Sequence, residues 1–175
     1  MSFEMEIQDK QEENNKLNVT KLRSFTASRW QAGRAHGVEH WDRVARFGNL
    51  LWEEGADLDV IMAFAYLHDA ERDGDGDDYL HGPKASKLVD VIRDTLLKAL
   101  TDEQIEKLKQ ACEQHTIAHR TGDITIDTCF DADRMDLPRV GITPLPDKMA
   151  TKKGAQLVGI PDYADFYAKF KKGEV

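Results

Sequence analysis

Apolar residues recur along this chain at the spacing of a helix. His40, Val44, Phe47 and Leu51 follow one another at i, i+4, i+7 and i+11, which places them on one helical face. Residues 60–68 (VIMAFAYLH) carry no charge, so they predict a helix at the buried centre of the fold. Alternation of period two is absent apart from a few residues near 124–126, and the pattern therefore predicts an all-α protein.

Residues typical of helix ends sharpen these boundaries. Pro83 suits the first turn of a helix that follows an aspartate- and glycine-rich loop. Thr101 begins another, with Gln104 three residues later as its capping-box partner. The predicted helices cover about residues 20–33, 38–54, 83–99, 101–122, 127–137 and 162–172. The uncharged helix between the second and third of these ranges is predicted to begin at Asp57 or Asp59.

The last predicted helix carries an aromatic face formed by Tyr163, Phe166, Tyr167 and Phe170. An aromatic stripe of this kind usually docks onto the core of its own domain, which is the expectation here. A lid or a contact between two copies of the chain is the alternative, and a homo-oligomer stays open.

Composition narrows the class of protein. A net charge of −8 argues against binding nucleic acid or an anionic membrane surface, because both need clusters of basic residues. No apolar run approaches about 20 residues, and the acidic start of the chain does not resemble a signal peptide. We expect a cytoplasmic protein with a polar extension over residues 1–19 and one domain over 20–175. Cys112 and Cys129 are expected to be buried thiols.

Histidines indicate a site. All six lie between positions 36 and 119, and three of them, His40, His68 and His115, sit on apolar helix faces. A buried imidazole needs a partner, and convergence on one cation would meet that need for all three. Asp69 follows the uncharged helix directly, where a buried carboxylate is costly unless it is paired or binds a metal. An ion pair with Arg72 is the simpler alternative.

The DADR segment offers two further carboxylates. Asp131 and Asp133 are two residues apart on a helix and point to nearly opposite sides. Asp133 shares a stripe with Phe130 and Leu137, so it is the better candidate ligand. Asp131 is then expected to cap a helix or to accept a hydrogen bond from an imidazole N–H.

Three segments together resemble the H…HD…D pattern of the HD-domain superfamily of metal-dependent phosphohydrolases. They are HGVEHWDRV, AYLHDAERD and FDADRMDL. The resemblance covers about residues 30–140, and RMDLPRVG further resembles an uncharacterised bacterial HD-like group. It implies an all-α, HD-domain-like helical bundle with a metal site among its central helices. It also implies the metal ligands His40, His68, Asp69 and Asp133.

The identity and the number of the metal ions stay open. Two imidazoles with two carboxylates suit Mn, Fe, Co or Ni, and Mg less well. Some HD-domain proteins carry two additional histidines that bind a second metal bridged by the aspartate of the HD pair, and His81 with His115 matches that order. The segment HGPKAS also resembles single-metal members, in which this histidine contacts the substrate or supports a ligand. His36 lies one turn before His40 and is expected to support a ligand, whereas His119 is expected to be structural or exposed.

The resemblance implies hydrolysis of a small phosphoester, possibly a nucleotide, by water that a metal activates. Asp69 would take part as a ligand, and Glu71 and Asp73 are candidate general bases. Cations must offset phosphate charge, and several basic residues lie near the proposed ligands in sequence. They are Arg72, Lys84 and Arg134, with Arg34 and Arg139 ranked lower. A di-iron oxygenase of the HD-domain type, which requires His81 and His115, and a non-catalytic metal-bound binding or sensor module are the alternatives.

Overall fold

The computed structural model describes residues 16–175, and this part of the chain contains helices and no strand. Eight α-helices and two short 3-10 helices follow one another along it. They are α2 (Val19–Arg29), α3 (Val38–Leu51), α4 (Leu58–Leu67), α5 (His81–Ile92), α6 (Asp102–Gln114), α7 (Ile124–Arg134), η1 (Leu137–Val140), η2 (Pro146–Lys148), α8 (Lys152–Val158) and α9 (Tyr163–Lys172). The predicted all-α class is confirmed.

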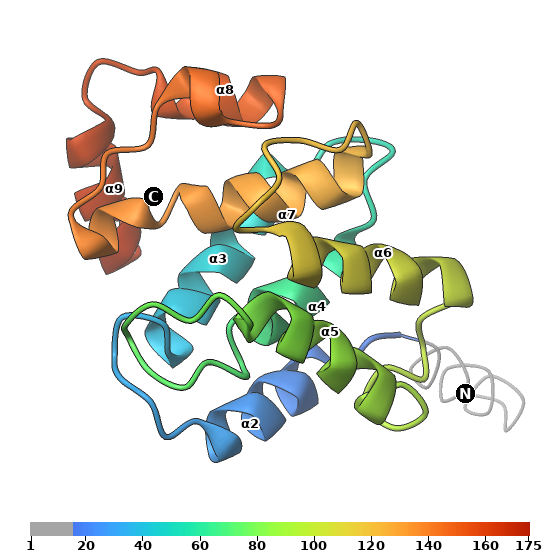
Figure 1. Cartoon of the computed structure of the whole chain (residues 1–175). Coiled ribbons are helices and arrows are strands. Elements are labelled where there is room, and N and C mark those ends of the chain that lie inside the picture. Colours follow the sequence, from blue (N-terminus) through green and yellow to red (C-terminus); the bar gives the residue numbers. More distant parts are fainter. Residues whose placement is uncertain (1–15) are drawn as a thin grey trace, which may run out of the picture.

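Helix α4 lies at the centre of the fold, as its uncharged sequence predicts. Every residue from Val60 to Leu67 is buried. Helices α2, α3, α5, α6 and α7 all pack against α4 (Figure 1). None of the helices in residues 16–175 is long and apolar enough to cross a bilayer.

Side-chain caps fix where several helices begin. Asp57 rather than Asp59 caps α4, by accepting a hydrogen bond from the backbone N–H of Val60 at 3.2 Å. The capping box between Thr101 and Gln104 is present in full, which confirms the predicted start of α6. These local signals are readable from sequence because each cap is completed within three residues.

Five predicted helix ends are wrong. Each helix ends three or more residues earlier than periodicity predicts: α2 at Arg29, α3 at Leu51, α5 at Ile92, α6 at Gln114 and α7 at Arg134. After α5 the chain turns tightly, and the N–H of Leu97 donates to the carbonyl of Ile92 at 3.2 Å. Leu97 is thereby buried, whereas Val91 in the last turn of α5 is 75% exposed.

The C-terminal helix α9 docks onto α3. Tyr163, Tyr167 and Phe170 are buried, and the ring of Phe170 stacks on that of Phe47 with 3.8 Å between centroids. The Arg46 guanidinium covers the same ring of Phe170 at 4.0 Å. The aromatic face therefore packs onto the core of its own domain, as expected.

The N-terminal boundary of the folded unit lies a few residues before the predicted one. Residues 1–15 of the predicted polar extension lie outside the described residues. Leu17 is buried in the main core, and Asn18 caps α2, so residues just before position 20 already belong to the folded unit. Cys112 and Cys129 are both buried free thiols.

Candidate metal centre

Six side chains from five helices converge near the end of α4. His68 caps α4 at its C-terminal end and Asp69 follows it. The others come from α3, from the first residue of α5, from the C-terminal cap of α6 and from the last turn of α7: His40, His81, His115 and Asp133. Because α4 is the central helix, four of the five helices packed around it can place a side chain at its end.

Each of the four imidazoles is held by a hydrogen bond from its Nδ1 atom. His68 Nδ1 donates to the Phe64 carbonyl at 3.0 Å, and His115 Nδ1 donates to the Cys112 carbonyl at 2.7 Å. A carbonyl oxygen can only accept, so Nδ1 carries the hydrogen in both rings, and a neutral ring then has its lone pair on Nε2. His81 Nδ1 donates in the same way to the Asp78 carbonyl.

The Nε2 atoms meet in two pairs. His40 Nε2 lies 3.1 Å from His68 Nε2, and His81 Nε2 lies 2.9 Å from His115 Nε2. Two lone pairs at this distance repel each other unless a proton or another cation lies between them. The rings are buried, so water does not screen this repulsion.

The first ligand group consists of His40 Nε2, His68 Nε2, Asp69 Oδ2 and Asp133 Oδ1. The two nitrogens lie 3.6 Å from Asp69 Oδ2, and they lie 3.3 and 3.6 Å from Asp133 Oδ1. Ligands about 2.1 Å from one ion are separated by about 3.0–3.4 Å in octahedral or tetrahedral geometry. The spacing of His40, His68 and Asp133 therefore fits a single divalent ion, and Asp69 lies next to both imidazoles of this set.

Asp133 supplies an independent observation. Its Oδ1 atom is buried and receives no hydrogen bond from any described residue. A buried carboxylate oxygen without a donor is costly, and a cation would offset this cost. The orphaned oxygen points at the two Nε2 atoms, so the residues present fit a metal ion.

Asp69 lies between the first ligand group and a second one. Its Oδ1 atom is 3.3 Å from His81 Nε2 and 3.8 Å from His115 Nε2, and these three atoms form the second ligand group. Arg72 already brings positive charge there, because its NH1 lies 3.4 Å from His81 Nε2 and 3.7 Å from Asp69 Oδ1. An arginine also lies near the first group, since Arg139 NH2 is 3.9 Å from Asp133 Oδ1. The first group nevertheless contains two carboxylates and is the stronger candidate metal site.

This geometry shifts the pKa values of three of these side chains. Burial alone would lower the pKa of His40, but the carboxylates of Asp133 and Asp136 beside its two ring nitrogens outweigh burial and raise the pKa. Burial alone would raise the pKa of Asp69 and Asp133, but the surrounding imidazoles hold both well below the usual range. The carboxylates are therefore ionised, and in the metal-free protein a proton on His40 partly balances them at a pH below its raised pKa.

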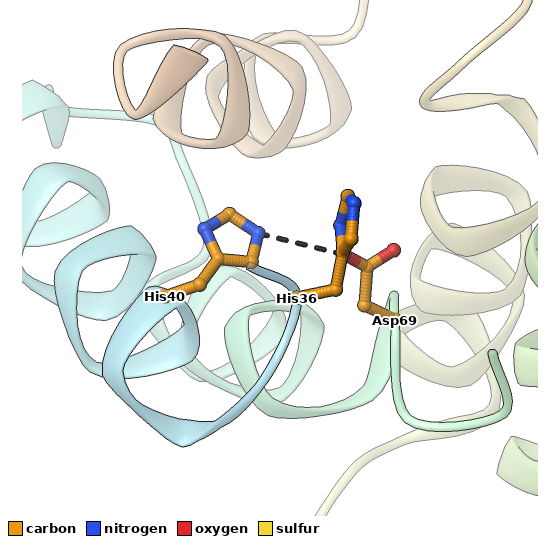
Figure 2. Close-up of side chains that lie close together, drawn as sticks. All are labelled: His36, His40 and Asp69. Atoms are coloured by element: carbon orange, nitrogen blue, oxygen red, sulfur yellow. Dashed lines mark hydrogen bonds and ion pairs between the residues drawn. The ribbon is translucent and has the colours of Figure 1, made fainter. Parts of the chain in front are cut away.

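The ligand groups face a cavity of about 340 Å³. Its wall includes Asp69, Asp133 and two arginines, Arg72 and Arg139, whose side chains are 9% and 8% exposed. His36 also lines it, with its Nδ1 2.8 Å from Asp69 Oδ2, so this residue supports a candidate ligand as expected. Figure 2 shows the imidazole of His40 directed toward the Asp69 carboxylate.

The structure corrects the prediction for Asp131. Its carboxylate accepts from the N–H of Ala150 at 2.7 Å, and from the N–H and hydroxyl of Thr151 at 2.8 Å each, so it ties α7 to the start of α8. It contacts no imidazole. Asp136 takes the predicted role instead, because its Oδ2 accepts from His40 Nδ1 at 2.7 Å.

Four of the other predicted residues lie outside the cavity. Glu71 pairs with Arg29 at 2.8 Å, and Asp73 pairs with Lys84 at 2.6 Å, so neither candidate base faces the ligand groups. Arg134 donates to three backbone carbonyls on segments beside α7. Each of these four side chains is held by a partner away from the ligand groups.

The structure supplies other charged groups at the cavity. Arg139, which ranked low in the sequence, lines the wall, and Asp75 is an acidic residue that does so as well. Arg34 is almost fully exposed and pairs with Glu39. His119 is exposed, with its Nε2 3.1 Å from the carbonyl of Met149.

Searches against protein-family models, curated proteins and solved structures find no match to this chain.

Proposed function

We propose that this protein is a metal-dependent phosphohydrolase of the HD-domain type that acts on a small phosphoester. The observation that supports it most is the first ligand group, in which His40 and His68 direct lone pairs at the same point as an orphaned carboxylate oxygen of Asp133. A divalent ion held there supplies Lewis acidity that activates water and polarises a phosphoryl oxygen.

The chain's own residues supply the remaining requirements. Arg72 and Arg139 present nearly buried guanidinium groups on the cavity wall, where they can offset phosphate charge at low dielectric. Both are anchored, since Arg72 donates to the Gly74 carbonyl and Arg139 Nε donates to the Ala35 carbonyl at 2.9 Å. A small phosphoester fits within the cavity of about 340 Å³.

The donor set favours particular ions. Two imidazole nitrogens with two carboxylate oxygens match Mn²⁺, Fe²⁺, Co²⁺ or Ni²⁺ better than Mg²⁺, which prefers oxygen ligands and retained waters. No thiolate belongs to the group, because Cys112 is a buried thiol whose pKa burial raises further.

The test compares metal content and hydrolysis in matched variants. We expect wild-type protein reconstituted with Mn²⁺ to hydrolyse members of a phosphomonoester panel, and His68→Ala and Asp69→Ala to lose both the metal and the activity. His119→Ala is the control, because that imidazole is exposed and lies outside both ligand groups. Undiminished hydrolysis by metal-free His68→Ala would refute the proposal, and an inert, fully metal-loaded wild type would favour a binding or sensor module.

The second ligand group favours one alternative, a di-iron oxygenase. His81 and His115 present paired Nε2 atoms beside Asp69 Oδ1, so a second ion could share Asp69 with the first. Elemental analysis of the protein loaded anaerobically with Fe²⁺ decides this. One iron per chain at saturation would exclude the oxygenase, whereas two irons with oxygen consumption would exclude a simple hydrolase.

A further inference from the structure

A buried carboxylate outside both ligand groups contacts the imidazole of one candidate ligand. Asp136 lies in the turn after α7 and is 0% exposed. Its Oδ2 accepts from His40 Nδ1 at 2.7 Å and from Arg43 NH2 at 3.0 Å. Its Oδ1 accepts from Arg43 Nε at 2.7 Å and from the Tyr167 hydroxyl at 2.8 Å.

These contacts settle the orientation of the carboxylate. Arg43 binds both oxygens in the two-pronged geometry that fixes a carboxylate plane. Tyr167 holds the oxygen that does not face His40, so Oδ2 stays directed at the imidazole. The pKa of Asp136 would be raised by burial but is lowered by His40 and Arg43, and the group remains an anion.

An oriented anion on Nδ1 determines what the other nitrogen of His40 can do. With the hydrogen held on Nδ1, the lone pair of the neutral ring is on Nε2 and faces His68 Nε2. Carboxylates in this position fix the tautomer of a metal-ligating histidine and raise its basicity. The quality of His40 as a ligand therefore depends on Asp136.

The C-terminal helix provides the outer end of this chain of contacts. Tyr167 is one turn away from Tyr163 on α9, and the Tyr163 hydroxyl donates to the carbonyl of Met135 at 2.7 Å. One phenol thus binds the backbone next to Asp136 and the other binds its carboxylate. The two tyrosines share a helix and a buried face, yet only Tyr167 touches the carboxylate that holds His40.

We propose that Tyr167, Arg43 and Asp136 are positioning residues that hold His40 in its ligating tautomer, so that the C-terminal helix controls metal affinity from outside the ligand groups. The proposal rests on the proposed function only for the presence of the metal ion, and no step of hydrolysis is needed to test it.

Tyr167→Phe is the decisive variant, because it removes one hydroxyl and leaves the ring that packs near Phe47. Tyr163→Phe is the matched control, since it also removes one buried hydroxyl from α9. We expect Tyr167→Phe to weaken Mn²⁺ affinity, measured by competition with a chelating dye, about three- to tenfold, and Tyr163→Phe to stay within about twofold. Asp136→Asn is expected to lose about 10- to 100-fold.

A second readout needs neither metal nor activity. Long-range ¹H–¹⁵N spectra of histidine-labelled, metal-free protein, recorded at a pH above the raised pKa of His40 so that the ring is neutral, report which nitrogen of His40 carries the hydrogen. We expect the Nδ1–H form in wild type and Tyr163→Phe, and a mixture of tautomers in Asp136→Asn. Equal metal affinity in the two tyrosine variants, or an unchanged tautomer in Asp136→Asn, would overturn the proposal.

The failure of the proposed function looks different. A wild type that binds Mn²⁺ but hydrolyses no phosphoester, with weakened binding in Tyr167→Phe, would leave the positioning role standing and remove the hydrolase. A wild type that binds no metal at all would remove the hydrolase and the control of metal affinity together.

Discussion

Replacing Asp131 with asparagine is expected to destabilise the protein and to leave its metal binding intact. The change tests which carboxylate of the DADR segment serves the site and which serves the fold. Asp131 is fully buried, and three hydrogen bonds of 2.7–2.8 Å connect it to Ala150 and Thr151. Gly154 permits this approach, because a Cβ atom there would lie 2.3 Å from Asp131 Oδ2.

The magnitude follows from what asparagine cannot do. One of the two acceptor oxygens becomes an NH₂ group, so the N–H of Ala150 or Thr151 faces another donor inside the protein. A buried polar group that loses its partner costs about 1–3 kcal/mol, and the remaining bonds lose the strength of a charged acceptor. Burial raises the pKa of Asp131, so neutralising the group returns part of this cost. We expect a net loss of about 2 kcal/mol.

The assay is urea and thermal unfolding followed by circular dichroism, with metal content measured on the same samples. For a chain of this length about 2 kcal/mol corresponds to a fall of about 4–8 °C in Tm. Asp165→Asn, an exposed control on α9, should change stability by less than about 0.5 kcal/mol. Asp133→Asn should lose metal affinity instead. A stable Asp131→Asn protein, or one that loses its metal as Asp133→Asn does, would refute the reasoning.

Two other perturbations follow from the same geometry. The raised pKa of His40 stabilises the metal-free protein below about pH 6.5, and this stabilisation is lost as the pH rises through the pKa of the folded state. The lowered pKa of Asp69 has the opposite effect: it stabilises the folded protein above about pH 3.8, and this stabilisation is lost as the pH falls through the pKa of the folded state. Because metal binding must displace the proton on His40, the Tm increase caused by Mn²⁺ should grow between about pH 5.5 and 8; an increase independent of pH would contradict this. Gly82→Ala should lower the free energy of unfolding, measured in urea, by about 1–3 kcal/mol. The new Cβ would lie 2.7 Å from the Cys112 carbonyl oxygen and push α5 away from α6, so wild-type stability of this variant would contradict the close packing of the two helices.

The sequence predicts best what is completed locally. The face formed by His40, Val44, Phe47 and Leu51 is buried throughout, because helical spacing alone decides which side chains share a face. The capping box of Thr101 is confirmed for the same reason. Both features depend on neighbours within one or a few helical turns.

Helix ends and hydrogen-bond partners across the fold are predicted less well. Periodicity continues α6 past Gln114, but His115 turns its Nδ1 back onto the Cys112 carbonyl, and Ile117 is left 80% exposed. Asp136 was missed because Arg43 and Tyr167, which stabilise its burial, are 93 and 31 residues away. One sequence signal was available, since Asp136 stands between the apolar residues Met135 and Leu137 at the end of a helix.

The basic residues of the predicted phosphate site show the same limit. Lys84 and Arg134 lie close to candidate ligands in sequence, yet each points to a structural partner on the outer side of the fold. Arg139 faces the cavity because η1 turns the chain back after α7. Proximity along the chain does not decide direction once a turn intervenes.

Anomalous diffraction from crystals of the Mn²⁺-loaded protein tests the central claim most directly. The account predicts a manganese peak bound by His40 Nε2, His68 Nε2, Asp69 and Asp133, with His40 Nδ1 still bonded to Asp136. A peak bound by other residues, or no peak at this position in fully loaded protein, would contradict it.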